Sequence, residues 1–169
     1  MIKLLPTEKF TITTHLRPDR VEDKLSNFVD PYKIIRFSFP FAPPPDKPYE
    51  GTIGNSLFKI QRFSRYKKRN SLPVIEGTIS PHERGSLINV TIKPNKIFQF
   101  FMSVFPFFYI SICMVVGLSF LLHGDNDARS IGILLLLSPL WMAIVSFFII
   151  KSFKSDLQKD KSFLLEIFK

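Results

Sequence analysis

The sequence lacks the residues on which several common classes of protein depend. Its single cysteine, Cys113, excludes an internal disulfide framework. The three histidines are far apart in the chain, so their spacing indicates no metal site. The seven glycines form no phosphate-binding loop, and no Gly-x-Ser-x-Gly motif occurs. We therefore expect a protein that is not an enzyme and that has no metal and no cofactor.

The N-terminus also lacks the features of an export signal. Residues 1–9, MIKLLPTEK, contain no apolar run followed by small residues at a cleavage site. The first 97 residues hold 17 Lys and Arg against 9 Asp and Glu, a net charge of +8. We expect residues 1–97 to form a basic domain that stays in the cytoplasm.

Two long stretches lack charge altogether. Residues 98–122 and 130–150 contain no charged side chain, and at about 1.5 Å per residue each helix would exceed the roughly 30 Å core of a bilayer. The polar residues 123–129 suit a turn between them. We predict two transmembrane helices in a hairpin. A buried globular hairpin is the alternative, but no other segment could cover two helices that are apolar all round.

Flanking charges predict the orientation of this hairpin. Lys93 and Lys96 precede the first span, and Lys151 and Lys154 follow the second. Positive residues stay on the cytoplasmic side, so both termini should be cytoplasmic and the turn external. We expect the protein in the inner (plasma) membrane. Because neither span contains Asp, Glu, Lys, Arg or His, a channel or transporter is not expected.

Sequence periodicity predicts an α+β fold for the cytoplasmic domain. Pro18 and the acids after it favour a helix over 18–29, which Asp30-Pro31 should end. Pro40–Pro48 should be an extended loop. Apolar alternation predicts strands at 10–15, 34–39, 49–53, 57–63, 72–79 and 87–92. The simplest arrangement is an antiparallel β-meander with one face covered by one or two helices.

Residues 151–169 predict a cytoplasmic amphipathic helix. Five apolar residues would lie on one side of it, namely Phe153, Leu157, Leu164, Ile167 and Phe168. This helix could lie flat in the membrane interface. We favour docking on the sheet, because both ends of the hairpin emerge on the same side of the membrane.

A basic loop is predicted between two of the strands. Residues 87–92 should run toward the membrane, because the first span follows them. The neighbouring antiparallel strand, 72–79, then runs away from the membrane. The loop before residue 72 should therefore lie near the headgroups. Each cation there contributes about 1 kcal/mol of attraction to an anionic surface. A solvated turn and a contact with protein or nucleic acid are the alternatives. The predicted lipid-headgroup contacts are Arg62, Arg65, Lys67, Lys68 and Arg69.

Four residues within the spans are candidates for helix packing or for contact with a partner in the membrane. They are Tyr109, Ser111, Ser138 and Trp141. Trp141 lies in mid-span, where anchoring at the membrane interface cannot explain it. Small and hydroxyl-bearing residues often mark helix contacts in lipid.

The motifs Tyr49-Glu-Gly-Thr-Ile53 and Asn70-Ser-Leu-Pro-Val-Ile-Glu-Gly-Thr-Ile79 resemble a pattern in uncharacterised small bacterial membrane proteins. Those combine a strand-rich cytoplasmic domain with two C-terminal transmembrane helices. The resemblance implies this architecture over residues 49–150 and implies no activity. The element order is also similar to half of a helix-grip lipid-binding domain, at the level of fold only.

Two hypotheses of function follow. The first is a non-catalytic membrane module, an accessory or scaffold subunit, with membrane lipids and another membrane protein or a second copy as partners. The second is binding of a lipid or other amphiphile between the sheet and the C-terminal helix. A nucleic-acid partner is not expected, because the charge is concentrated in one loop without an aromatic platform.

Overall fold

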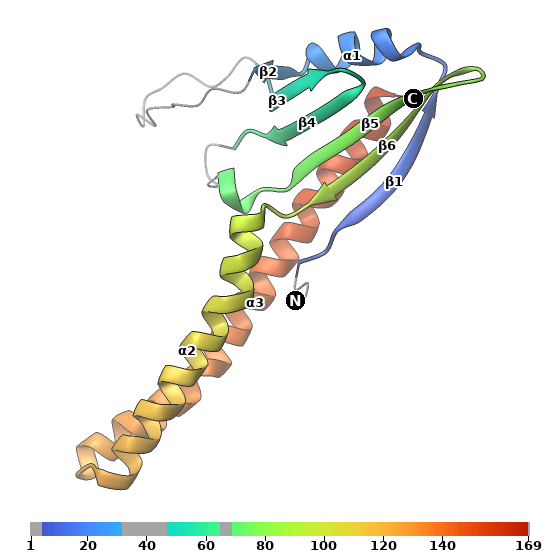
Figure 1. The fold of residues 1–169 in the computed structure, drawn as a ribbon. Coiled ribbons are helices and arrows are strands. Elements are labelled where there is room, and N and C mark those ends of the chain that lie inside the picture. The colour runs from blue at the N-terminus through green and yellow to red at the C-terminus, as the bar shows by residue number, and fades with distance from the viewer. Residues whose placement is uncertain (1–4, 32–46, 65–68, 169) are drawn as a thin grey trace. The chain divides into compact units, whose positions relative to one another are not determined.

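A computed structural model describes residues 5–31, 47–64 and 69–168. The chain divides into two compact units (Figure 1). One unit comprises residues 1–5 and 96–152, and the other comprises residues 6–95 and 153–169. Helix α3, Asn126–Ile167, contributes to both, because its residues after Ser152 belong to the second unit.

The second unit contains a six-stranded sheet in the order β1-β6-β5-β4-β3-β2. The predicted α+β class is confirmed. Its strands are β1 (Glu8–Thr14), β2 (Val29–Pro31), β3 (Tyr49–Gly54), β4 (Leu57–Arg62), β5 (Val74–His82) and β6 (Gly85–Lys93). A short 3-10 helix, η1 (Arg69–Ser71), precedes β5. The two-residue β3–β4 turn has positive φ at Asn55 and Ser56, the backbone that suits a tight hairpin.

The meander is mixed and not purely antiparallel as predicted. Strand β2 pairs in parallel with β3, with Val29 opposite Tyr49. A parallel pair cannot be joined by a tight turn and needs a connection of about a dozen residues or more. Residues 32–48 supply that length. The predicted strand 34–39 and most of the predicted loop Pro40–Pro48 lie outside the described residues.

Helix α1, Pro18–Ser26, ends earlier than the predicted 18–29. Val29 was expected on the helix face, but it pairs in β2 instead. Proline at position 31 favours extended backbone at the residue before it, which opposes a helix there. The Lys47 ammonium also donates to the Ser26 carbonyl at 2.6 Å, where the helix ends.

One face of the sheet is apolar and covered. The strand register aligns Phe10, Val90, Gly77 and Phe58 in one row across four strands. Rows on either side hold Ile92, Ile75 and Ile60, and Ile12, Ile88 and Ile79. Helix α1 packs Val21 and Leu25 against the sheet.

The C-terminal part of α3 supplies the other cover. Its buried residues are Phe153, Asp156, Leu157, Asp160, Leu164 and Ile167. Lys161 lies over the Phe10 ring, which places this segment on the apolar face. The predicted docking of the tail on the sheet is thus confirmed. The ring of Phe163 on α3 meets that of Phe28, in the segment just after α1, edge to face.

The first unit is a helical hairpin of α2, Lys96–His123, and residues 126–152 of α3. Both helices are long and apolar enough to cross a membrane. Only residues 124 and 125 separate them, so the turn is shorter than the predicted 123–129. Asp127 in the first turn of α3 complements the dipole of that helix, which favours an early start.

Candidate functional site

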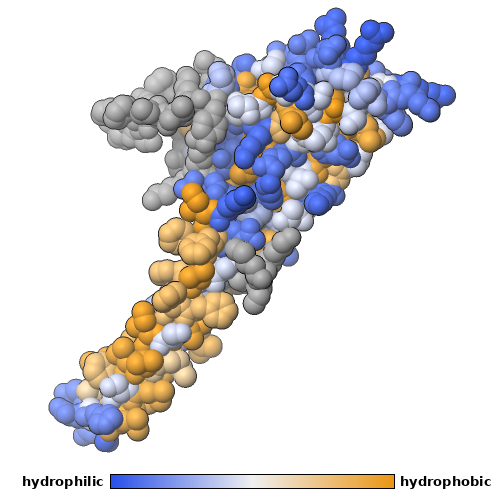
Figure 2. Space-filling model, viewed as in Figure 1, coloured by the Kyte–Doolittle hydropathy of each residue, from blue (hydrophilic) through white to orange (hydrophobic). Residues whose placement is uncertain are grey.

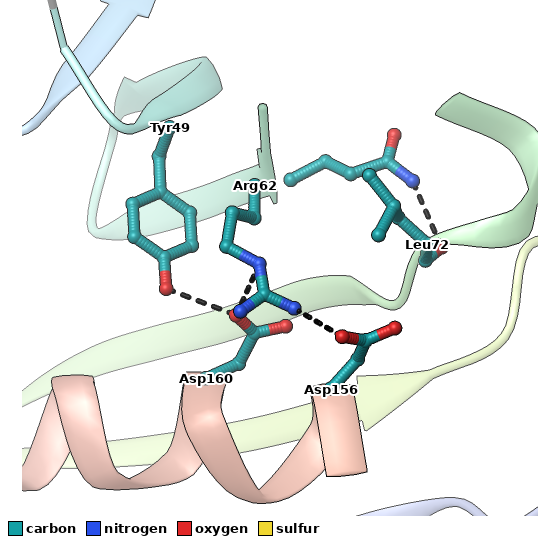
Figure 3. A network of polar contacts seen from close by, with 6 residues as sticks. Tyr49, Arg62, Leu72, Asp156 and Asp160 are labelled. Atoms are coloured by element: carbon teal, nitrogen blue, oxygen red, sulfur yellow. Dashed lines mark hydrogen bonds and ion pairs between the residues drawn. The ribbon is translucent and has the colours of Figure 1, made fainter. Parts of the chain in front are cut away.

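A buried polar network crosses the interface between the sheet and α3 (Figure 3). Tyr49 at the start of β3 donates its hydroxyl to Asp160 Oδ1 at 2.9 Å. Arg62 at the end of β4 donates Nη2 to Asp156 Oδ1 at 2.9 Å, and its Nε lies 3.5 Å from Asp160 Oδ1. One guanidinium therefore faces two carboxylates on successive turns of α3.

Burial sets the electrostatics of this network. The Asp160 side chain is 0% exposed, and burial raises the pKa of its carboxyl to about 6, against the opposing effects of Arg62 and Tyr49. Burial and the neighbouring Asp160 also raise the pKa of the Tyr49 phenol, which keeps its proton for the hydrogen bond. The Phe163 ring stacks on Tyr49 with centroids 4.5 Å apart and covers this site with apolar atoms.

A sequence signal for this network exists, although the sequence reasoning missed it. Asp160 lies three residues after Leu157 and four before Leu164, so it falls on the apolar side of the predicted helix. An acid at such a position must be paired or neutral. Asp156 lies one turn earlier on the same side of the helix.

The opposite face of the sheet is polar. Glu76 on β5 forms ion pairs with Lys93 of β6 and with Lys59 of β4, the latter at 3.2 Å. Burial alone would raise the pKa of Glu76, but hydrogen bonds from the two lysines outweigh it and lower that pKa. Nearby, Thr11 donates to the Asn89 amide oxygen at 3.1 Å. Around Glu76 and Thr11 this face has the character of a water-exposed surface.

The predicted headgroup residues are only partly described. Arg62 belongs to the buried network, where it holds two carboxylates. Arg65, Lys67 and Lys68 lie outside the described residues, and Arg69 begins the short helix η1. Their contact with headgroups stays a prediction, and Arg62 has a structural role besides.

The helices of the hairpin pack closely at two glycines. A Cβ atom on Gly132 would lie 2.9 Å from the Gly117 carbonyl oxygen, and one on Gly117 would lie 2.9 Å from Leu136 Cγ. Any larger residue would force the helices apart. Small residues allow this approach between helices in membranes. The sequence reasoning did not single out these glycines, although glycine within an apolar span is the usual signal.

Ser138 contacts the neighbouring helix and satisfies a carbonyl that a proline leaves without its usual donor. Pro139 has no N–H, so the Leu135 carbonyl loses its normal helical donor. Ser138 Oγ donates to that carbonyl at 2.7 Å and lies 3.3 Å from Cys113 Sγ on α2. Serine often satisfies freed carbonyls in this way inside membranes.

The other three candidates in the spans lie differently. Trp141 is 68% exposed and Ser111 is also exposed, so neither packs within the hairpin, and Tyr109 is half-buried. Their contact with a partner stays a prediction. Among the residues that the structure describes, no group of His, Cys, Asp or Glu is arranged to hold a metal ion.

Comparison with known proteins adds no relative: no family model, no curated protein and no solved structure matches the chain.

Proposed function

We propose that the chain is a two-span integral membrane protein that acts as a non-catalytic accessory or scaffold subunit of a membrane protein complex. The exposed apolar surface of the hairpin carries this proposal. Val115, Leu122 and Leu134 are each at least 70% exposed, and hydrophobic residues cover most of the visible face of the hairpin apart from its hydrophilic tip (Figure 2). A surface of this kind suits lipid and would be unstable in water.

Details inside the hairpin support a lipid environment. The two glycines let the helices approach closely, and the Ser138 hydrogen bond satisfies the Leu135 carbonyl without water. The flanking lysines and the acidic turn favour cytoplasmic termini in a bacterial plasma membrane. Carbonate extraction of full-length protein tests insertion: it should stay in the membrane pellet. Recovery in the supernatant without detergent would refute the proposal.

Trp141 is the best candidate for contact with a partner subunit. A large aromatic at mid-span, 68% exposed on the hairpin, is unexplained by packing within the chain. Aromatic anchors of this kind often dominate binding energy. Trp141→Ala should reduce recovery of the partner, or of a second copy, after purification in mild detergent. Leu140→Ala is the matched control, because Leu140 is 65% exposed at nearly the same depth. Equal recovery of the partner with both variants would show that Trp141 does not contribute to the interface.

Headgroup contact by the basic loop remains part of this proposal. We expect the loop cations to retain anionic lipid during purification, measured by native mass spectrometry. Replacing Arg65, Lys67, Lys68 and Arg69 with Gln should reduce the retained lipid. The control replaces four cations elsewhere, namely Arg17, Arg20, Lys24 and Arg84. A similar loss in both variants would show that only net charge matters.

Amphiphile binding between the sheet and α3 is the second candidate. The described contacts favour a packed interface there, because Tyr49 meets both Asp160 and Phe163 directly and Lys161 pairs with Glu8. A lipid that copurifies with the protein and is lost on Leu164→Trp, which would fill that space, would favour this second function instead.

A further inference from the structure

The polar network between the sheet and α3 has its most deeply buried group at Asp160. Three elements face this carboxyl: β3 through Tyr49, β4 through Arg62, and α3 through Asp156. Side-chain exposure falls from 21% for Arg62 to 9% for Asp156 and 0% for Asp160. An ionised Asp160 would therefore hold its charge where water does not reach it.

The two oxygens of Asp160 differ in their partners. Asp160 Oδ1 accepts from Tyr49 and faces Arg62, but Oδ2 is buried without a hydrogen-bond partner among the described residues. A buried carboxylate oxygen without a donor is costly when it carries charge. A proton on this carboxyl removes that charge and leaves the Tyr49 hydrogen bond intact, since Oδ1 still accepts.

We propose that Asp160 is a proton-binding group that sets how tightly the C-terminal segment of α3, residues 153–167, docks on the sheet. The neutral acid favours the docked segment, and the ionised acid weakens docking. This inference does not depend on the proposed membrane function, because every residue involved lies in the second unit.

The direction of the effect follows from linkage. The docked carboxyl has its pKa raised to about 6, whereas a solvent-exposed one has a pKa of 3.8. The docked state therefore binds the proton more tightly, so its advantage is complete below the lower value and is lost as the pH rises through about 6. Between about pH 5 and about pH 7.5 the docking equilibrium should weaken about tenfold.

Hydrogen exchange of the full-length protein in detergent tests this. Amide protection of residues 153–167, corrected for the intrinsic pH dependence of exchange, should fall about tenfold from about pH 5 to about pH 7.5. Asp160→Asn keeps an acceptor for Tyr49 and cannot ionise, so its protection should be independent of pH over that range.

Glu8→Gln is the matched control. Glu8 also pairs with α3, through Lys161, and its side chain is 25% exposed. This variant should keep the tenfold dependence, because it leaves Asp160 unchanged. Wild-type protection that stays constant or rises with pH would overturn the proposal, even if Asp160→Asn fails to fold. A dependence that persists in Asp160→Asn would also overturn it.

Discussion

The hairpin and the sheet unit place their polar groups in opposite positions. In the hairpin, large apolar side chains such as Leu134 and Trp141 point outward, while Ser138 and Cys113 meet inside. In the sheet unit, Ile75 and Ile88 are fully buried, and Lys59 and Glu76 form ion pairs on the outside. The exposed groups of the sheet unit suit water, whereas those of the hairpin suit the lipid that we propose around it.

The largest expected effect comes from placing an acid on each exposed surface. Leu140→Asp should raise the apparent free energy of insertion of residues 130–150 by about 3 kcal/mol, because a carboxylate at mid-span loses its hydration. A translocon insertion assay measures this. In the sheet unit, Leu57 is 55% exposed, and Leu57→Asp should change stability by no more than about 0.5 kcal/mol.

These two substitutions also test whether the hairpin and the sheet unit face different solvents. Both begin from an exposed leucine, so any difference between them arises from the surrounding solvent and not from the residue that is removed. If Leu140→Asp were as mild as Leu57→Asp, water and not lipid would surround the hairpin.

A second pair of substitutions tests the inside of the sheet unit. Leu164 is 0% exposed and Leu165 is 42% exposed, although they are neighbours in α3. Leu164→Ala should lower the free energy of unfolding of this unit by about 3 kcal/mol, through lost burial and a residual cavity. Leu165→Ala should cost less than about 1 kcal/mol. Hydrogen exchange of β5 and β6 in increasing urea measures both. Equal costs would mean that the segment is not docked in solution.

The sequence predicted the parts of this fold that depend on periodicity. The apolar side chains of residues 151–169 repeat at helical spacing, and that face is the one buried on the sheet. Alternation located the strands from β3 to β6 within a few residues. Two stretches without charge became the two long apolar helices. These patterns are local, and the solvent imposes them directly on the chain.

Features that depend on contacts distant in sequence were not predicted. The parallel pairing of β2 with β3 brings Val29 beside Tyr49 across a long connection, and no local pattern specifies that partner. The Tyr49–Asp160 hydrogen bond joins residues 111 positions apart. Arg62 was singled out because it adjoins a basic run, and its ion pairs with Asp156 and Asp160 of α3 were not predicted. Charge alone does not reveal which side chains turn inward.

The smallest expected effect concerns Glu76 on the water-exposed face, and it sharpens the contrast with Asp160. The two lysines lower the pKa of Glu76 against the effect of burial, so the folded state binds its proton less tightly than the unfolded state does. The stability that Glu76 contributes is therefore present above its ordinary pKa of 4.5 and is lost as the pH falls through the lowered value. The pH dependence at Asp160 runs in the opposite direction, because its contribution to stability is lost as the pH rises.

The magnitude at Glu76 should be below about 1 kcal/mol, since the side chains of Lys59 and Glu76 are 64% and 33% exposed and water and salt screen the pair. Urea unfolding of the wild type and of Glu76→Gln at falling pH measures it. The acid-side loss should disappear in Glu76→Gln and should shrink in high salt. A loss of equal size in Glu76→Gln would assign the acid sensitivity to another carboxylate. The pH dependence of stability would then no longer differ in direction between the exposed Glu76 and the buried Asp160.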